Sequence, residues 1–216
     1  EWETLDDGLT FRVKLREGVK FHDGNELTSE DVVFTFKTIK HPDYQGPRAA
    51  DLEPIEDIVA VDKYTVDFKL KEPFAPIIHN ITYGIMEKKL FEDVEVADLG
   101  NHKYSWEPIG TGPYIFKEYV RGQYVLLERN PNWFRSEEAN GGPFIQTVRM
   151  KVIPDDQTAL AALENGEIDV DTPPPMEVKR LLSDYEGKLI PVQYQRNGWG
   201  YMLLNTTKPP LDDYRV

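Results

Sequence analysis

The feature that most constrains this chain is a strand, a glycine-marked loop and a capped helix that follow one another over residues 8–40. Apolar and polar residues alternate at its start, through Leu9, Thr10, Phe11, Arg12, Val13, Lys14, Leu15 and Arg16. This period of two predicts a strand with one apolar and one basic face. Gly18 and Asp23-Gly24 mark the loop. Thr28, with Asp31 three residues later, resembles a capping box and predicts a helix over 29–40.

Composition narrows the possible classes. The 216 residues are 40% hydrophobic and 12% aromatic, enough for one large domain or two small ones. The net charge of −13 argues against binding to nucleic acid and against docking on an anionic lipid surface. Without cysteine, disulfides, thiolate zinc sites and cysteine nucleophiles are excluded. There is no run of 18 apolar residues and no leader, and residues 208–216 read as a loop before a helix. We therefore interpret the chain as a fragment.

The order of predicted elements indicates a mixed α/β (α+β) chain. Two hairpins are expected, over 55–70 and over 114–129. Further helices are expected over 74–82, 87–98 and 176–184, and further strands over 146–153, 167–171, 188–195 and 199–205. Asp155 or Asp156 is expected to cap one more helix, which runs through Ala159, Leu160, Ala162 and Leu163. Asn165-Gly166 predicts a left-handed helix cap. Two glycines and two prolines between Pro108 and Pro113 predict an irregular, fixed backbone.

The sequence carries no strong motif of a catalytic site or of a metal-binding site. The four histidines lack the i, i+4 spacing of a helical metal pair, and neighbouring acidic pairs are better explained as caps and solvated loops. Gly110-Thr111-Gly112 fails as a dinucleotide loop because Ile115 stands where the third glycine belongs and Pro113 removes an N–H. No metal site is predicted, and an enzyme is the weaker hypothesis.

Aromatic residues in the last predicted strand pair form a candidate binding surface. Tyr194, Trp199 and Tyr201 stand close to Gly198 and Gly200. Glycines let a ligand approach the backbone while aromatic rings supply apolar contact. Ordinary packing within a sheet is the alternative, because aromatic residues are common in strands.

Five motifs, in order, resemble those of the bacterial extracellular solute-binding proteins of family 5. They are 9–24 with 28–32, 108–114, 126–133, 163–169, and 201–216. The family captures solutes for ABC importers, and its members are longer than this chain. The resemblance implies part of a type II-like periplasmic binding protein fold, in which two lobes close on a ligand. Residues 1–108 would form an additional subdomain and 109–216 part of the first ligand-binding lobe, with the second lobe absent.

The resemblance also implies a site and a mechanism. Tyr201 corresponds to a cleft position of the family, with Asn205 at the end of that strand and Trp199 and Gly198 beside it. Tyr44 corresponds more loosely to a cleft-lining tyrosine. In peptide-binding relatives the second lobe supplies a carboxylate for the peptide's amino terminus. These residues would take part in capture rather than catalysis, with no cofactor.

The implied function is capture of peptides outside the cytoplasmic membrane, by a free or lipid-anchored protein that is monomeric at full length and delivers its cargo to a membrane permease. Main-chain hydrogen bonding suits peptides because it ignores side-chain identity. Nickel chelates, haem and oligosaccharides stay open as cargo for the same fold. A hydrolase and a transcriptional regulator with a borrowed sensor domain are alternatives from other classes.

Overall fold

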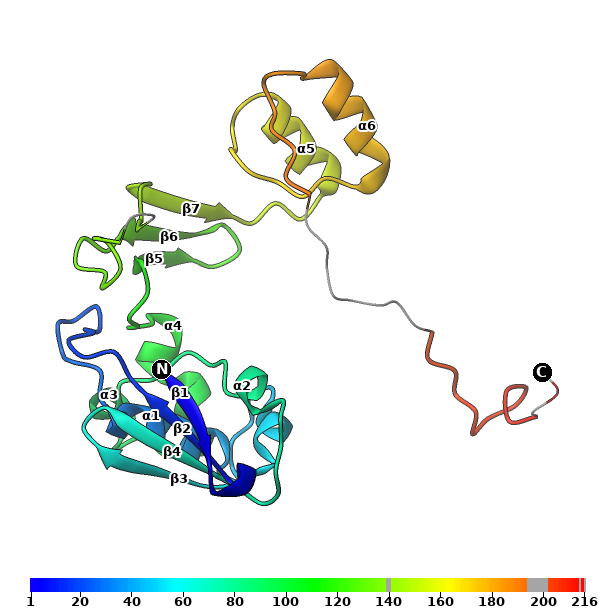
Figure 1. Cartoon of the computed structure of the whole chain (residues 1–216). Helices are drawn as coiled ribbons and strands as arrows, with labels where there is room; N and C mark the ends of the chain where they lie inside the picture. Colours follow the sequence, from blue (N-terminus) through cyan, green and yellow to red (C-terminus); the bar gives the residue numbers. More distant parts are fainter. Residues whose placement is uncertain (139–140, 194–201, 214, 216) are drawn as a thin grey trace. The chain divides into compact units, whose positions relative to one another are not determined.

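The computed structural model describes residues 1–138, 141–193, 202–213 and 215. The chain divides into two units, Glu1–Val152 and Ile153–Val216, each described by itself (Figure 1). The first contains β1 (Trp2–Leu5), η1 (Asp6–Gly8), β2 (Thr10–Lys14), α1 (Ser29–Ile39), η2 (Ala49–Leu52), β3 (Ile55–Asp62), β4 (Thr65–Leu70), α2 (Ile77–Asn80), α3 (Lys88–Phe91), η3 (Val96–Asn101), α4 (Lys103–Trp106), β5 (Tyr114–Val120), β6 (Tyr124–Arg129) and β7 (Thr147–Lys151). The second contains α5 (Asp156–Glu164) and α6 (Pro175–Asp184).

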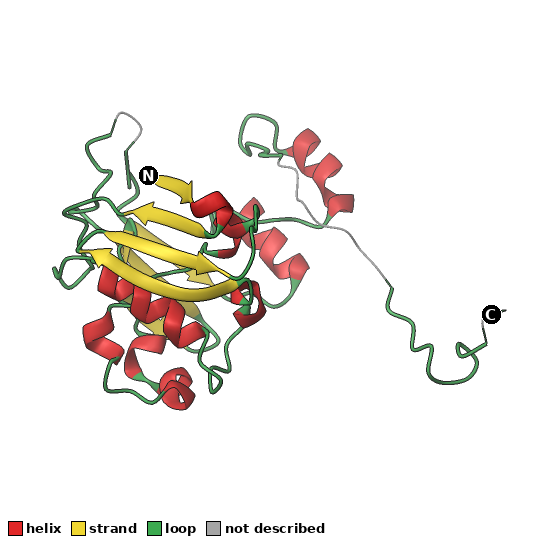
Figure 2. Cartoon of the chain, turned by 60° about the horizontal axis from the view of Figure 1, so that its bottom comes forward, coloured by secondary structure: helices red, strands yellow, loops and turns green. Residues whose placement is uncertain are grey.

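A four-stranded antiparallel sheet of order β1-β2-β4-β3 organises the first unit. Helix α1 packs on one face of it, as Figure 2 shows. Phe36 of α1 meets Phe68 of β4 edge-on, with ring centroids 5.1 Å apart. The core around this pair includes Leu52, Ile55 and Val66, each fully buried. The other face of the sheet carries the polar side chains of β2, as the alternation in the sequence predicts.

The predicted start of α1 is confirmed. The backbone N–H of Thr28 donates to Oδ2 of Asp31 at 2.8 Å, which is the carboxylate half of a capping box. The other oxygen of Asp31 accepts the backbone N–H of Lys88 at 2.9 Å. Asp31 is 7% exposed. One buried carboxylate therefore fixes both the start of α1 and the position of α3.

A second sheet, β5-β6-β7, is an antiparallel meander within the same unit. Both predicted hairpins are confirmed, since β3 pairs with β4 and β5 pairs with β6. The strand β7 confirms the one predicted over 146–153. Contacts place the main division of the chain after Val152, whereas the loop between α4 and β5 separates the two sheets. The assignment of 1–108 and 109–216 to a subdomain and a lobe stays a prediction.

The second unit begins with a capped helix. Asp155 precedes α5, and its Oδ1 accepts the backbone N–H of Thr158 at 2.8 Å. Gly166 follows α5 with a φ of +74°, which confirms the predicted left-handed cap. Pro175 opens α6, where the missing N–H costs nothing.

Some predicted elements are wrong. Residues 167–171 are not a strand, and neither are the described parts of the two last predicted strands, 188–193 and 202–205. The helix expected over 87–98 is two pieces, α3 and η3, and that expected over 74–82 shortens to α2. Strand propensity fails in the second unit because a strand needs a partner strand, and its described residues offer none.

Candidate functional site

The predicted binding residues at the end of the chain are only partly described. Gly198, Trp199 and Tyr201 lie outside the described residues. Asn205 is exposed, and its Oδ1 accepts the N–H of Thr207 at 3.1 Å and the hydroxyl at 2.7 Å. This Asx turn already uses the side-chain oxygen of Asn205. Its role toward a ligand stays a prediction.

Tyr44, the fifth predicted residue, lies in the first unit after α1, half-buried against the main core. Beside it, Arg48 donates to Asp51 at 2.7 Å and lies over the ring of Tyr83, 4.5 Å from the centroid. Burial, above all, raises the pKa of Tyr83, and the charge of Asp51 adds to it. Tyr44 therefore packs against the core from the loop that leads to this polar cluster. Tyr44 belongs to the first unit and Asn205 to the second, and each unit is described by itself.

The segment between the two sheets is held by His22, which the sequence did not single out. The backbone N–H of Gly110 donates to Nδ1 of His22 at 3.3 Å, and Nε2 lies 3.0 Å from the carbonyl oxygen of Gly112. The same carbonyl accepts Nδ2 of Asn130 at 3.1 Å. The imidazole thus carries its hydrogen on Nε2. The signal available in the sequence was the glycine-proline run itself, whose fixed backbone needs partners for its polar groups.

A hollow of about 690 Å³ lies beside this segment, and we call it the junction hollow. Its lining residues are His22, Asp23, Lys103, Tyr104, Trp106, Glu107, Pro108, Ile109, Ile115, Phe116, Lys117, Glu118 and Tyr119. The ring of Trp106 is 57% exposed and lies nearly parallel to that of Tyr119, at 11°. The indole N–H of Trp106 donates to the carbonyl of Gly100 at 3.1 Å, which fixes the ring. Anchored aromatic faces among charged side chains suit binding of a solute.

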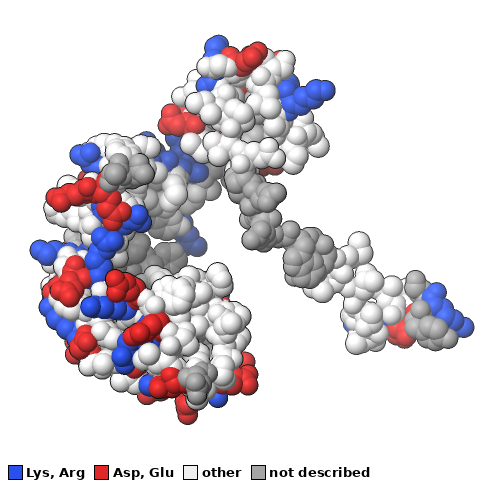
Figure 3. All heavy atoms as spheres, in the orientation of Figure 1, with Lys and Arg blue, Asp and Glu red and all other residues white. Residues whose placement is uncertain are grey.

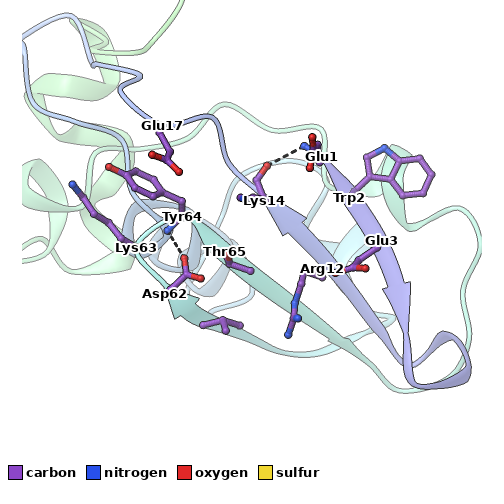
Figure 4. A pocket seen from close by; sticks show the side chains of 11 residues that line it. Glu1, Trp2, Glu3, Arg12, Lys14, Glu17, Asp62, Lys63, Tyr64 and Thr65 are labelled. Carbon is purple, nitrogen blue, oxygen red and sulfur yellow. Dashed lines mark hydrogen bonds between the residues drawn. The ribbon is translucent and has the colours of Figure 1, made fainter.

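A second hollow, of about 660 Å³, lies over the sheet face opposite α1. Figure 4 shows Arg12, Lys14, Glu17 and Tyr64 around it. Arg12 makes a two-pronged ion pair with Asp67 at 2.7 and 2.9 Å. The hydrogen bonds from Arg12 hold the pKa of Asp67 below its ordinary value. The basic face predicted for this strand is therefore partly neutralised by its neighbour β4.

Basic side chains lie next to acidic ones elsewhere on the first unit too. On the face drawn in Figure 3, its basic and acidic side chains are interspersed rather than gathered by sign. Glu26 accepts from Lys63 at 2.8 Å and from Tyr64 at 2.7 Å. These hydrogen bonds, that of Lys63 first, lower the pKa of Glu26 to about 2. Within the described ranges, no three histidine, aspartate or glutamate side chains are grouped to hold a metal ion.

Comparison with known proteins decides the family. The sequence model of the bacterial extracellular solute-binding proteins, family 5 Middle, matches residues 1–216. The chain belongs to this family. The resemblance that the five motifs carry is thereby confirmed, as is the mixed α/β fold of that family over part of its length.

Family 5 members provide close comparisons for this chain. The oligopeptide-binding protein AppA of Bacillus subtilis is 39% identical over 178 residues, covering 81% of this chain and 32% of AppA. The solved structure of that protein with a nonapeptide matches with a TM-score of 0.76 at 38% identity, covering 84% of this chain and 36% of that one. NikZ from Campylobacter jejuni, solved with Ni(L-His), matches with a TM-score of 0.76 at 26% identity, covering 85% and 36%.

The family 5 chain therefore spans about a third of the length of AppA. The family is one of extracellular solute-binding proteins, and AppA is named as a binding protein rather than an enzyme. Among the helices that the structure describes, none combines the length and the hydrophobicity that a membrane span requires.

Proposed function

We propose that the protein containing this chain captures peptides outside the cytoplasmic membrane and delivers them to the permease of an ABC importer. The observation that carries this proposal is the 39% identity to AppA over 178 residues, together with the nonapeptide in the solved structure of AppA. Peptide capture needs backbone donors and acceptors and apolar surface, without a reacting group. The protein acts as a binder, in the periplasm or lipid-anchored, and is monomeric at full length.

The proposed cargo site uses the residues that the resemblance assigns. Tyr201, Trp199 and Gly198 line the cleft beside Asn205, and Tyr44 contributes from the subdomain of residues 1–108. The first lobe includes 109–216, and ligand binding favours closure because the ligand contacts both lobes. The junction hollow is a second candidate for the same role, since Trp106 presents a fixed and exposed ring there.

Thermal unfolding of the natural-length protein tests the cargo. A nonapeptide of mixed sequence at 100 times its dissociation constant should add about 2.7 kcal/mol to the free energy of unfolding. The N-acetylated nonapeptide is the matched control for recognition of the amino terminus, and it should shift the melting temperature less. Stabilisation by Ni(L-His) alone, the ligand of NikZ, would replace peptides by a nickel chelate as cargo. A stabilising oligosaccharide or haem would replace them in the same way.

Two variants separate the candidate sites. Trp199→Ala should lower the nonapeptide affinity if the predicted strand pair lines the cleft, whereas Trp106→Ala should leave it unchanged. The opposite result would move the site to the junction hollow. Tyr185→Phe is a control, because its hydroxyl contacts Glu164 within the second unit. Mass spectrometry of the peptide after incubation should recover it intact, and cleavage would favour the hydrolase.

A further inference from the structure

A buried carboxyl group stands directly before α3. Glu87 is 3% exposed. Its Oε1 accepts Nδ2 of Asn25 at 2.7 Å. Within the part of the chain that the structure describes, its Oε2 has no hydrogen-bond partner. An ionised carboxylate in this position would be short of donors, which is unfavourable in a buried environment.

The neighbour of Glu87 is a second carboxyl group. Nδ2 of Asn25, which serves Glu87, also donates to Oδ2 of Asp23 at 2.6 Å. The backbone N–H of Asn25 donates to Oδ1 of Asp23 at 3.1 Å. One amide group thus serves two carboxyl groups that are both acceptors when ionised. Burial, and next the charge of Asp23, raise the pKa of Glu87.

We propose that Glu87 and Asp23 share one proton in the folded protein, and that this proton fastens the loop of residues 21–25 to the start of α3. The proton comes from solvent and stays on Glu87, whose O–H donates to the carboxylate of Asp23. The pair then carries one negative charge instead of two. Adjacent carboxyl groups behave this way because two like charges at short range disfavour a second ionisation.

The charged groups around Glu87 do not remove the need for that proton. They line a hollow with it and are Glu26, Glu30, Asp31, Lys88, Lys89 and Glu92. Lys88 pairs with Glu30 at 2.9 Å, and Lys63 from outside the hollow pairs with Glu26 at 2.8 Å. The hydrogen bond from Asn25 and the charge of Lys89 lower the pKa of Glu87, but burial and the charge of Asp23 raise it and are the two larger causes. The net direction is therefore toward the protonated form.

The same loop reaches the segment between the two sheets. His22, which holds Gly110 and Gly112, is adjacent to Asp23 in the chain. Loss of the shared proton would therefore loosen a loop that is bonded on both sides, to α3 and to the segment leading into β5. The first unit thus contains a pH-dependent contact between this loop and α3. The contact needs no ligand, so it is independent of peptide capture.

The direction of the pH effect follows from proton linkage. In the unfolded chain a glutamate carboxyl releases its proton near pH ~4.3. The folded protein holds the proton to a higher pH, so the stabilisation is fully present below that value and is lost as pH rises through the folded pKa. Glu87→Gln keeps an N–H donor for Asp23 at every pH and does not titrate. The melting temperature of this variant minus that of the wild type should therefore increase between about pH 4.5 and about pH 8.

Two further variants complete the test in the natural-length protein. Glu92→Gln removes an exposed carboxyl group just after α3, and its melting temperature should follow the wild type over the same range. Asp23→Asn removes the partner charge and should flatten the pH dependence of the wild type. A Glu87→Gln difference that stays constant with pH, or that turns destabilising as pH rises, overturns the proposal.

A direct measurement on the unaltered protein decides the matter even if a variant fails to fold. The side-chain carboxyl carbon of Glu87, followed by ¹³C NMR, should titrate above the midpoint of glutamate in a peptide, and a midpoint at or below that value rules out the shared proton. A final measurement adds calcium chloride to the wild type and to Glu87→Gln. If calcium raises the melting temperature of the wild type and not of Glu87→Gln, a cation balances the two carboxylates and the shared proton is wrong.

Discussion

The two units of the chain bury their apolar side chains to very different extents. In the first, α1 lies on a four-stranded sheet, and 11 buried residues form one core that includes Phe36 and Phe68. In the second, the described buried apolar residues are Leu160, Ala162 and Leu181, whereas Val170, Met176, Ile190, Val192, Met202 and Leu203 are at least 80% exposed. A sheet offers a helix a continuous apolar face, but two short helices offer each other only a narrow stripe.

Polar contacts take a correspondingly larger part in the second unit. Arg180 of α6 donates to Glu164 of α5 and, at 2.9 Å, to Glu177 within its own helix. The hydroxyl of Tyr185 reaches the other oxygen of Glu164 at 3.1 Å. Such partly exposed ion pairs contribute little net stability. We therefore expect the free energy of unfolding to be concentrated in the sheet-and-helix core of the first unit.

The largest expected effect comes from deleting a core ring. Phe36→Ala removes a side chain that is 2% exposed and leaves a cavity against Phe68, so it should cost about 3–5 kcal/mol. The matched change in the second unit is Met176→Ala, at a position 83% exposed, which should stay within about 0.5 kcal/mol. Urea unfolding of both variants measures the difference. Equal losses of unfolding free energy in the two variants would contradict the inferred difference between the units.

Helix capping gives an intermediate effect. Asp31→Ala leaves the N–H groups of Thr28 and Lys88 without their acceptor in a buried position, so it should cost about 2 kcal/mol. Asp155→Ala removes the exposed cap that Thr158 uses and should cost about 1 kcal/mol. Chemical unfolding of the two variants sharpens the comparison, because both aspartates accept a backbone N–H at a helix start, Asp31 from the third helical position and Asp155 from the N-cap position. A larger loss at Asp155 would contradict the role assigned to burial.

The smallest expected effect is that of the ion pairs of α6. Arg180→Gln should lower the free energy of unfolding less than either cap variant, since the side chain of Arg180 is 42% exposed and water screens its ion pairs. Added salt should reduce this loss because it screens exposed charges. Lys179→Gln is the control, since it removes an equal charge from the same helix. If the loss at Arg180 were several kcal/mol and insensitive to salt, polar contacts would hold the second unit more firmly than we infer.

Local signals in the sequence were sufficient for most elements of the first unit. The alternation through β3 and β4 predicted their pairing, and Thr28 with Asp31 located the start of α1. The same kind of reasoning left Asp155 or Asp156 as the cap of α5, of which the structure has Asp155, and it placed the other end at Asn165-Gly166. Each of these features depends on residues a few positions apart, so the chain alone specifies them.

The candidate site was less accessible to sequence reasoning. Resemblance supplied Tyr201, Asn205, Trp199, Gly198 and Tyr44, and these remain predictions as ligand contacts. Nothing in local spacing indicated that His22 would bind Gly110 and Gly112, which lie about 90 residues away. Nor did the sequence show that Trp106 and Tyr119 would present parallel rings.

The sequence by itself therefore determined the hairpins, the helix caps, the mixed α/β class and, through its five motifs, the family. Tertiary structure alone decided that residues 2–5 become an edge strand beside β2, that Arg12 meets Asp67, and that Glu87 is buried where Asn25 also donates to Asp23. These contacts join distant parts of the chain, and their strength depends on burial. Burial is a property of the packed molecule, so no local pattern of residues specifies it.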